Sequence, residues 1–200
     1  LVIDGSITII GSDAFAECVL STIILPNTVT TIETAAFSQV DITSINIPAS
    51  VTSLGDYPFS SCPLTSITVD SANTVYYGEG NCIIERDTKT VVVGCKTSAI
   101  PSDVLRIGNY AFDGCRDIAT MTIPNGVISI GSYAFDYCYE LTTMEIPASV
   151  TSMGRGVFSG CFGIENLSVA SGNTTYYSES NCIIERETKT LVNGCKTSVI

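Results

Sequence analysis

Residues 127–147 read VISIGSYAFDYCYELTTMEIP, and this stretch decides the fold. Its end, LTTMEI, alternates apolar and polar side chains, which predicts a strand with Met144 and Ile146 pointing inward and Glu145 pointing outward. Pro147 ends that strand because proline has no N–H for a ladder. VISI predicts a second short strand that ends at Gly131, and SYAFDYC has the length of a single helical or 3₁₀ turn. The stretch therefore predicts one coil of a solenoid, with two sides formed by strands and a third side formed by a turn.

The same coil recurs along the whole chain of 200 residues. The apolar residue before or at each IP-like junction marks the register, and successive junctions are 22, 22, 22 and 31 residues apart, then 23, 23, 23 and 31. Repeats at such periods predict a solenoid, because a single coil cannot bury its apolar side. The junction residues are Ile3, Leu25, Ile47, Val69, Ile100, Ile123, Ile146, Val169 and Ile200.

One phenylalanine occupies the turned segment of each short coil. We expect each of these rings to stack on the previous one along the solenoid axis and to form the core with the other inward residues, each of which contributes roughly 1.5–3 kcal/mol when neighbouring coils cover it. The residues are Phe15, Phe37, Phe59, Phe112, Phe135 and Phe158.

The stretch SIGSYAFDYCYELTTMEIPASVTSMG resembles the leucine-rich repeat of BspA-like surface proteins, a 22–23-residue class with the pattern I-G-x-x-A-F-x-x-C-x-x-L-T-x-I-x-I-P. The resemblance covers essentially the whole chain. It implies a β-rich, right-handed solenoid with a parallel β ladder on one face and with short extended segments and helical or 3₁₀ turns on the other. The departures are local: Glu33 replaces a glycine, Pro58 and Val157 replace the alanine, and Val40 replaces the cysteine.

Three short coils and one long coil occur twice, which predicts one solenoid over residues 1–200 built from two tandem units, 1–100 and 101–200. In each unit the long coil, 70–100 or 170–200, carries nearly the same sequence, NCIIERDTKTVVVGCK or NCIIERETKTLVNGCK. We expect each to leave the ladder, form a projecting β-hairpin and re-enter the ladder. The resemblance agrees, because BspA-like arrays often carry hairpin coils.

A tyrosine pair precedes each hairpin strand. Tyrosines are frequent at contact hot spots, so Tyr76, Tyr77, Tyr176 and Tyr177 are candidate contact residues. The alternative is that they cover the apolar face of the hairpin.

Nine cysteines are present, and five of them follow a repeat phenylalanine by three positions. The equivalent position of one coil is Val40, which can only fill space, so we interpret these five as small buried residues whose S–H helps a turn carbonyl. No CxxC spacing and no histidine supports a zinc site or a nucleophilic cysteine. The five residues are Cys18, Cys62, Cys115, Cys138 and Cys161.

The hairpin cysteines pose a different question. If Arg86 lies opposite Val91, then Cys82 lies opposite Cys95, and Cys182 opposite Cys195 in the second copy. Cβ atoms of opposed strand residues are about 4.5–5.5 Å apart, close to what a disulfide requires. Two disulfides are one alternative and buried free thiols are the other, since a shift of one residue would place the sulfurs on opposite faces.

The composition excludes several functions. The chain has 20 acidic and 9 basic residues, a net charge of −11, which argues against binding nucleic acid or an anionic membrane surface. No apolar run is long enough to cross a membrane. There is no histidine, so the common catalytic triads and general bases are absent. No motif for a metal, phosphate or other cofactor is present. Acids in the turns, such as Asp113 and Asp136, are expected to be solvated. We expect no enzymatic activity and no cofactor.

The outward residues of the ladder are small, polar and nearly uncharged. A face of this kind is what an exposed sheet tolerates, but it also offers hydroxyl groups to an extended macromolecule. The candidate contact residues on it are Ser44, Asn46, Thr68, Thr120, Thr122, Thr143 and Glu145.

The resemblance implies adhesion at the cell surface, because BspA-like proteins are implicated in binding extracellular-matrix proteins. The expected partner is a matrix or cell-surface protein, with a glycan as a weaker candidate because tryptophan is absent. The rival function is a structural spacer in a larger surface protein. We expect the chain to be part of a longer extracellular protein whose signal and anchor lie elsewhere. Its apolar ends, including Val199 and Ile200, would favour end-to-end association of two copies.

Overall fold

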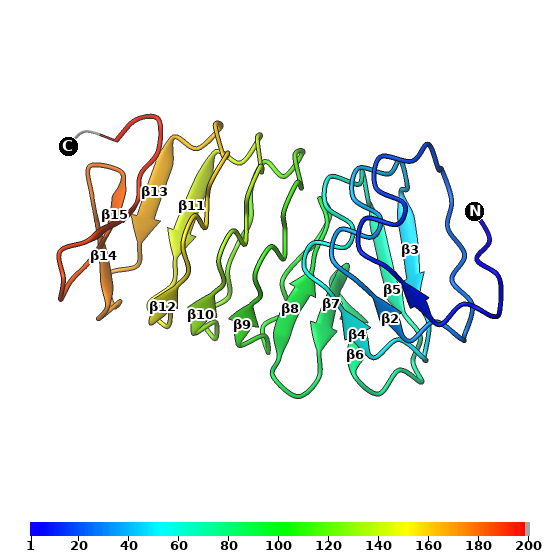
Figure 1. Cartoon of the computed structure of the whole chain (residues 1–200). Coiled ribbons are helices and arrows are strands. Elements are labelled where there is room, and N and C mark those ends of the chain that lie inside the picture. The colour runs from blue at the N-terminus through cyan, green and yellow to red at the C-terminus, as the bar shows by residue number, and fades with distance from the viewer. Residues whose placement is uncertain (199–200) are drawn as a thin grey trace.

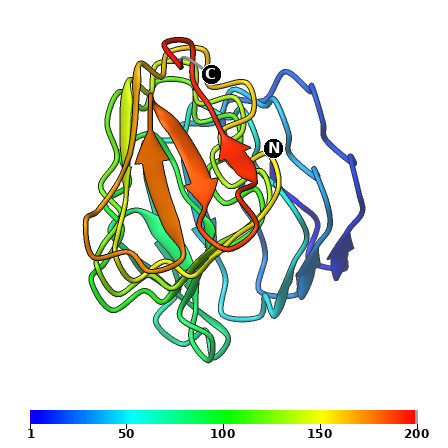
Figure 2. The same cartoon turned by 90° about the vertical axis from the view of Figure 1, so that its left-hand side faces the viewer.

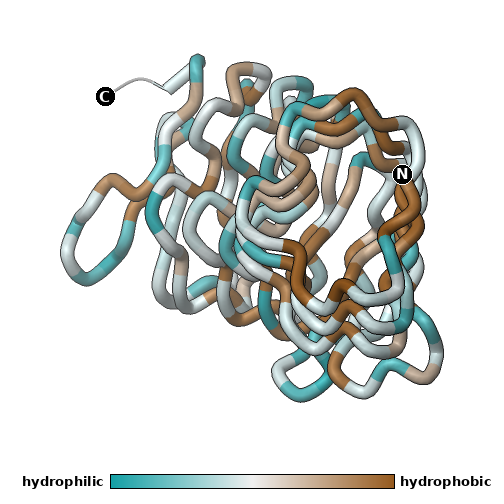
Figure 3. The backbone as a smooth tube through the Cα atoms, turned by 45° about the vertical axis from the view of Figure 1, so that its right-hand side comes forward, coloured by the Kyte–Doolittle hydropathy of each residue, from teal (hydrophilic) through white to brown (hydrophobic). Residues whose placement is uncertain are grey.

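The computed structural model describes residues 1–198, and it shows a solenoid of stacked coils with strands and turns but no helix (Figure 1). The N-terminal coils lie at one end of the stack and the second hairpin at the other. Apolar segments recur at the same place in successive coils (Figure 3), as the repeat requires. The expected repeat solenoid of leucine-rich type is therefore confirmed, while Val199 and Ile200 lie outside the described residues.

A long parallel ladder forms one side of the solenoid. Its strands alternate exposed and buried residues, because the period of a strand places successive side chains on opposite faces. Ser44 lies beside Ser66 and Thr143 beside Asn166, and each pair of strands stays in register over four residues. The strands are β3 (Ser44–Ile47), β5 (Ser66–Val69), β11 (Thr143–Ile146) and β13 (Asn166–Val169).

A second, short parallel ladder forms another side, with strands of two residues. Glycine ends several of them because the neighbouring coil comes too close for a side chain: a Cβ on Gly131 would lie 2.5 Å from the backbone nitrogen of Asn109. The strands are β1 (Ile9–Ile10), β2 (Thr31–Ile32), β4 (Ser53–Leu54), β9 (Arg106–Ile107), β10 (Ser129–Ile130) and β12 (Ser152–Met153).

The third side, which we call the turn face, differs from the expected helical or 3₁₀ turn. Alternate N–H groups bond in different directions: Phe15 donates to the Ala36 carbonyl of the next coil (2.9 Å), whereas Ala16 donates to Asp13 within its own turn (3.0 Å). Asp13 and Glu17 have φ values of 56° and 60°, in the left-handed region. A 3₁₀ helix would use every N–H locally, so linked turns replace it, and half of their donors join the coils together.

The phenylalanines stack, but not in one continuous column as expected. Phe15, Phe37 and Phe59 stack with centroids 5.3 and 5.7 Å apart, and the three of the second unit stack at 5.1 and 5.6 Å. Gly94 stands at the phenylalanine position between the two runs. Its N–H donates to the Ala111 carbonyl of the next coil (2.7 Å), and a Cβ on it would lie 2.0 Å from the Phe112 ring. The long coil has a glycine there because the next ring fills the space.

Each long coil forms three antiparallel strands rather than a freely projecting hairpin; those of the first belong to a six-stranded sheet and those of the second form a sheet of their own. The first contains β6 (Tyr76–Glu79), β7 (Cys82–Glu85) and β8 (Thr90–Val93), and the second contains β14 (Tyr176–Glu179), β15 (Cys182–Glu185) and β16 (Leu191–Asn193). β8 also continues the short ladder, since Thr90 and Val91 pair in parallel with Arg106 and Ile107 of β9. Viewed along the axis, the second sheet lies across the end of the solenoid (Figure 2).

Strand β7 runs through the core. Cys82, Ile83 and Ile84 are all fully buried, with no exposed surface. Ile83 packs into the apolar cluster of the N-terminal coils, whereas Cys82 and Ile84 pack into the cluster of the following coils. The expectation that the hairpin projects is therefore wrong for β7 and β8, which have no exposed residue, whereas Glu79 of β6 and Asp87 of the β7–β8 loop are exposed. The hairpin coil separates the core into two halves because a strand with two apolar faces can be covered from both sides.

Candidate functional site

The long ladder is interrupted in the second unit. Residues 120–123 occupy the place of a strand between the first hairpin coil and β11, but only one ladder-type bridge, Thr120 to Thr143, joins them to β11. On the other side, the Ala99 N–H bonds to the Gly80 carbonyl in the hairpin loop (2.9 Å) and not to a neighbouring ladder strand. Because the coils are not held together along this segment, a groove opens beside it.

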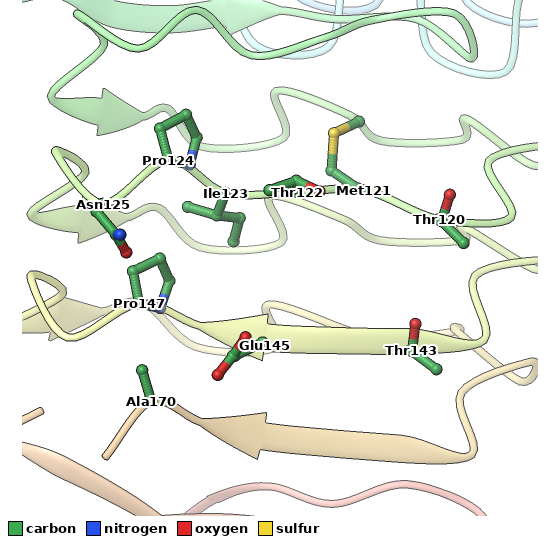
Figure 4. Close-up of a pocket in the computed structure, with 10 residues that line it drawn as sticks. All are labelled: Thr120, Met121, Thr122, Ile123, Pro124, Asn125, Thr143, Glu145, Pro147 and Ala170. Atoms are coloured by element: carbon green, nitrogen blue, oxygen red, sulfur yellow. The ribbon is translucent and has the colours of Figure 1, made fainter. Parts of the chain in front are cut away.

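The groove has a volume of about 620 Å³, and a smaller hollow of about 290 Å³ adjoins it across residues 120–124. Figure 4 shows the Thr143 and Glu145 side chains on β11 facing the segment that carries Thr120 and Thr122, with Pro124 and Pro147 at one end. We call this site the ladder groove. Its lining residues are Thr120, Met121, Thr122, Ile123, Pro124, Asn125, Thr143, Glu145, Pro147 and Ala170.

Four of the candidate contact residues meet in the ladder groove: Thr120, Thr122, Thr143 and Glu145. All four are exposed. Within residues 1–198, none of their side chains makes a hydrogen bond or an ion pair. Glu145 is the one ionisable residue that lines the groove. The groove therefore presents three free hydroxyl groups and one free carboxylate, together with the apolar wall of the prolines.

The other candidates on the ladder lie elsewhere. Ser44, Asn46 and Thr68 are exposed on β3 and β5 of the first unit. There the Thr68 hydroxyl donates to Asn46 Oδ1 (2.9 Å), so these two side chains satisfy each other. The candidate ladder residues thus form two groups. Those of the first unit lie on β3 and β5, where Asn46 and Thr68 are hydrogen-bonded to each other, and those of the second unit line the ladder groove.

Sequence reasoning missed Pro124 and Pro147 as wall residues, since it interpreted Pro147 only as a strand end and did not single out Pro124. Both prolines occupy the same position of the repeat in adjacent coils. This position could have predicted that they form one wall, because equivalent residues of adjacent coils lie side by side.

The tyrosine pairs do not form an exposed platform. Tyr76 and Tyr176 are each only 5% exposed, and their hydroxyls accept hydrogen bonds from the Leu54 N–H (3.2 Å) and the Met153 N–H (3.0 Å). Each phenol completes the short ladder where the hairpin interrupts it. This burial contradicts a contact role for Tyr76 and Tyr176 and fits the covering alternative.

Tyr77 and Tyr177 are half-buried. The Lys89 ammonium and the Arg86 guanidinium lie 4.8 and 5.3 Å from the Tyr77 ring centroid, and Lys89 forms an ion pair with Asp103 (3.0 Å). Burial raises the pKa of Tyr77. Cations cover its ring, and an equivalent pair covers Tyr177. A contact role for these two tyrosines stays a prediction.

Of the five repeat cysteines, Cys115 and Cys138 are buried as expected, Cys62 and Cys161 are half-buried, and Cys18 is exposed. The Cys138 S–H donates to the Phe112 carbonyl of the preceding coil (3.3 Å) and the Cys161 S–H to Phe135 (2.8 Å), so the thiols link adjacent coils. Burial raises the pKa of Cys62 to about 11, which keeps that thiol neutral and unreactive. Cys18, in the coil at the N-terminal end of the described stack, is exposed rather than buried.

The expected register of the hairpin cysteines is wrong. Ile84 lies opposite Val91 instead of the residue two positions further on, and the register then shifts between adjacent residues of β7. Cys95 is therefore not opposite Cys82, and a similar shift occurs in the second hairpin. All nine cysteines, including Cys182 and Cys195, are free in the structure. The free-thiol alternative applies, because the bulge moves the second sulfur out of the opposed position.

Two acids of the turn face are withdrawn from solvent, contrary to the expectation that they are solvated: Asp136 is buried and Asp113 is half-buried. Asp136 is 8% exposed, its Oδ1 has no hydrogen-bond partner, and burial raises its pKa. Burial also raises the pKa of Asp113 to about 6, with the nearby Asp136 carboxylate acting in the same direction. Neither lines the ladder groove, and within residues 1–198 no three histidine, cysteine or acidic side chains are grouped to hold a metal ion.

Comparisons with known proteins agree with the coil geometry. The family model of the BspA-type leucine-rich repeat region matches residues 1–86 and 89–192, with six copies. This match confirms the resemblance seen in the repeat. No curated protein matches the chain. In the described part of the chain, no helix has the length and apolar character needed to cross a membrane.

Solved structures of leucine-rich repeat proteins are similar over most of the chain. A leucine-rich cell surface protein from Faecalibacterium prausnitzii is 28% identical with a TM-score of 0.66, covering 86% of this chain and 54% of that one. A leucine-rich repeat protein from Eubacterium ventriosum is 24% identical with a TM-score of 0.73, covering 84% and 53%. The pneumococcal vaccine antigen PcpA is 18% identical with a TM-score of 0.67, covering 86% and 50%. The chain thus spans about half the length of these proteins. With its coils, its hairpin strands and the family match over nearly all residues, the chain belongs to the BspA-type leucine-rich repeat family.

Proposed function

We propose that the chain is a non-enzymatic binding module of the cell surface or extracellular space, and that it recognises a host or neighbouring-cell macromolecule through the ladder groove. The observation that carries the proposal is the group of four exposed, unbonded side chains, Thr120, Thr122, Thr143 and Glu145, at the one interruption of the ladder in the second unit. Family membership and the similarity to a cell surface protein support the location.

The groove fits a protein ligand better than a small metabolite. It is an open trough on the side of a solenoid, whereas small-molecule sites are concave and enclose most of the ligand. Solenoid faces usually bind extended surfaces. A ligand here would bond to the threonine hydroxyls and place a basic group near Glu145. The net charge of −11 favours the approach of such a ligand over long range.

Surface plasmon resonance against immobilised fibronectin, laminin and collagen, with a glycan array in parallel, tests the proposal. The groove variants are Glu145→Gln and Thr122→Val, which remove the charge and one hydroxyl with little change in volume. The matched control is Asn46→Ala, at the position of β3 that corresponds to Glu145 in β11. We expect binding to a matrix protein that weakens about tenfold or more in each groove variant and stays unchanged in the control.

Loss of binding in the control alone would place the ligand on the first unit and refute the groove. Binding only to glycans would refute the protein ligand. If the parent chain binds nothing on either surface, the binding function is wrong and the role of a structural spacer replaces it.

A further inference from the structure

The turn face of the second unit carries aromatic side chains that the repeat pattern does not predict. In one column the rings of Tyr110 and Tyr133 stack 5.2 Å apart at an interplanar angle of 13°. The Arg155 guanidinium lies 5.4 Å from the Tyr133 centroid. Tyr57 of the first unit meets Tyr110 edge-on at 4.9 Å. All three tyrosines are partly exposed, so the column forms a ridge of three rings and one cation along the coils.

A second column runs beside it along the same coils. Tyr139 stacks on Phe162 with centroids 5.9 Å apart and an interplanar angle of 11°, and the Arg116 guanidinium lies 5.6 Å from the Tyr139 centroid. Tyr137 meets Tyr139 edge-on at 6.0 Å. We call Arg116, Tyr137, Tyr139 and Phe162 the aromatic platform.

The solenoid fold does not require this platform, because the first unit forms the same coils without it. The residues of the first unit that correspond to Tyr137, Tyr139 and Phe162 are Gln39, Asp41 and Pro63. A fold that is stable with a polar side chain or proline at these places gains no necessary packing from aromatic ones. Concentrated aromatic residues on an otherwise polar face therefore indicate contact with a partner.

The platform is exposed and preorganised. Phe162 is 74% exposed and Tyr137 is 46% exposed, so both offer apolar surface to a partner. Gly160 makes room for the tyrosine, since a Cβ on that residue would lie 2.5 Å from Cδ1 of Tyr137. Rings held by neighbouring rings and by the backbone lose little conformational entropy on binding.

The charge of the platform is opposite to that of the chain. The three ion pairs among residues 1–198 are made by lysines, whereas Arg116 and Arg155 make no ion pair in the same region, and the charge of Arg116 only partly offsets the rise that burial causes in the pKa of nearby Asp113. The guanidinium of Arg116 donates only to Ser61 Oγ, at 3.4 Å. Among 20 acidic residues, two exposed arginines kept on aromatic faces present a positive site to an acidic partner.

From these contacts we propose that the aromatic platform is a second interaction surface that binds an acidic protein segment, with an apolar or aromatic side chain packed on Phe162 and a carboxylate on Arg116. Tyrosine and arginine are the residues enriched at protein hot spots. A sugar ring stacked on Phe162 would also need hydrogen-bond partners for its hydroxyls. Tyr139 and Arg116 could supply them, but a neutral sugar would leave the Arg116 charge unpaired, whereas a carboxylate of a protein segment would pair with it. A protein segment is therefore favoured over a glycan.

The probe is an array of short synthetic peptides in which leucine, phenylalanine or proline alternates with aspartate and glutamate, together with a matched array carrying lysine instead. Fluorescence anisotropy measures their binding to the whole chain. Phe162→Ser and Arg116→Gln are the platform variants, and Tyr137→Gln introduces the residue of the first unit. The matched control is Val19→Ser, because Val19 directly follows its repeat cysteine as Phe162 does and is 96% exposed.

We expect acidic peptides to bind, and their affinity to fall about tenfold or more in Phe162→Ser and Arg116→Gln while Val19→Ser matches the parent. Circular dichroism melts of the variants should coincide with that of the parent, since the substituted side chains are exposed. Equal binding of the lysine array, unchanged affinity in Phe162→Ser, or no binding of any acidic peptide would overturn the proposal. Binding of a glycan array that Phe162→Ser abolishes would overturn it in favour of a sugar ligand. The ladder-groove variants should not affect this binding, so the two surfaces are tested independently.

Discussion

Replacing Asn73 with alanine should destabilise the protein more than a polar substitution usually does. Asn73 is 2% exposed and uses its whole side-chain amide. Its Nδ2 donates to the carbonyls of Pro48 (2.8 Å) and Val51 (2.9 Å) of the preceding coil. Its Oδ1 accepts from the N–H groups of Val75 (2.9 Å) and Tyr76 (2.7 Å). The residue thus fastens the start of the hairpin coil to its neighbour.

Alanine at position 73 would remove all four bonds and leave four buried backbone groups without this partner. Each bond contributes about 1 kcal/mol net. Water can reach some of the freed groups, so we expect a loss of about 3 kcal/mol in the free energy of unfolding. For a chain of this size, that corresponds to a fall in Tm of roughly 6–12 °C.

Asn173 is the internal control, because it makes the same four kinds of bond in the second hairpin coil. β7 is covered on both faces, whereas in the second sheet Leu191 is 47% exposed. Asn73→Ala should therefore weaken the packing of β7 against both apolar clusters of the core, and Asn173→Ala should destabilise only the sheet of β14, β15 and β16. Circular dichroism melts give Tm, and hydrogen exchange locates the loosened amides. A change in Tm below about 1 °C for Asn73→Ala, or faster exchange confined to β6–β8, would refute the reasoning.

Four further outcomes concern groups withdrawn from solvent and the thiols. Because the pKa of Asp113 is raised from 3.8 to about 6, its contribution to stability is greatest below pH about 4 and declines as pH rises through 6. Urea unfolding at pH about 4 and about 6 measures this decline in the free energy of unfolding, and Asp113→Asn should reduce it by about 1–2 kcal/mol. The same decline in the variant and the parent would contradict the raised pKa of Asp113. Gly94→Ala should cost about 2 kcal/mol, since its Cβ would overlap the Phe112 ring; an unchanged urea midpoint would show that the ring moves aside freely. In timed alkylation followed by mass spectrometry, exposed Cys18 should react at once and buried Cys138 only as the chain unfolds, and equal rates would contradict the packing. Alkylation of the denatured, unreduced chain should modify all nine thiols.

Several features could be predicted from the sequence because they depend on local pattern repeated in register. The 22–23-residue period, the alternation in β11 and the stop at Pro147 were sufficient to predict the solenoid and its long ladder. The polar outward residues of the ladder were identified for the same reason, since the two-residue period of a strand assigns each side chain to one face. The four residues of the ladder groove were among them, although nothing local shows that they meet in a groove.

Features that depend on how coils meet could not be predicted. The direction of β7 through the core depends on coverage from both sides, and the shift that separates Cys82 from Cys95 depends on a bulge. The groove exists because the first hairpin coil bonds to its own loop at Ala99 and leaves residues 120–123 with a single ladder bridge, from Thr120 to Thr143.

By itself, the sequence determined the repeat, the family and the face on which each strand residue lies, because these follow from periodicity along the chain. Only the tertiary structure decided which of those residues are free to bind. Burial of Tyr76 and Asp136, the opening of the ladder groove and the stacking of the platform all arise from contacts between coils about 22 residues apart. Such contacts form only when successive coils stack on one another.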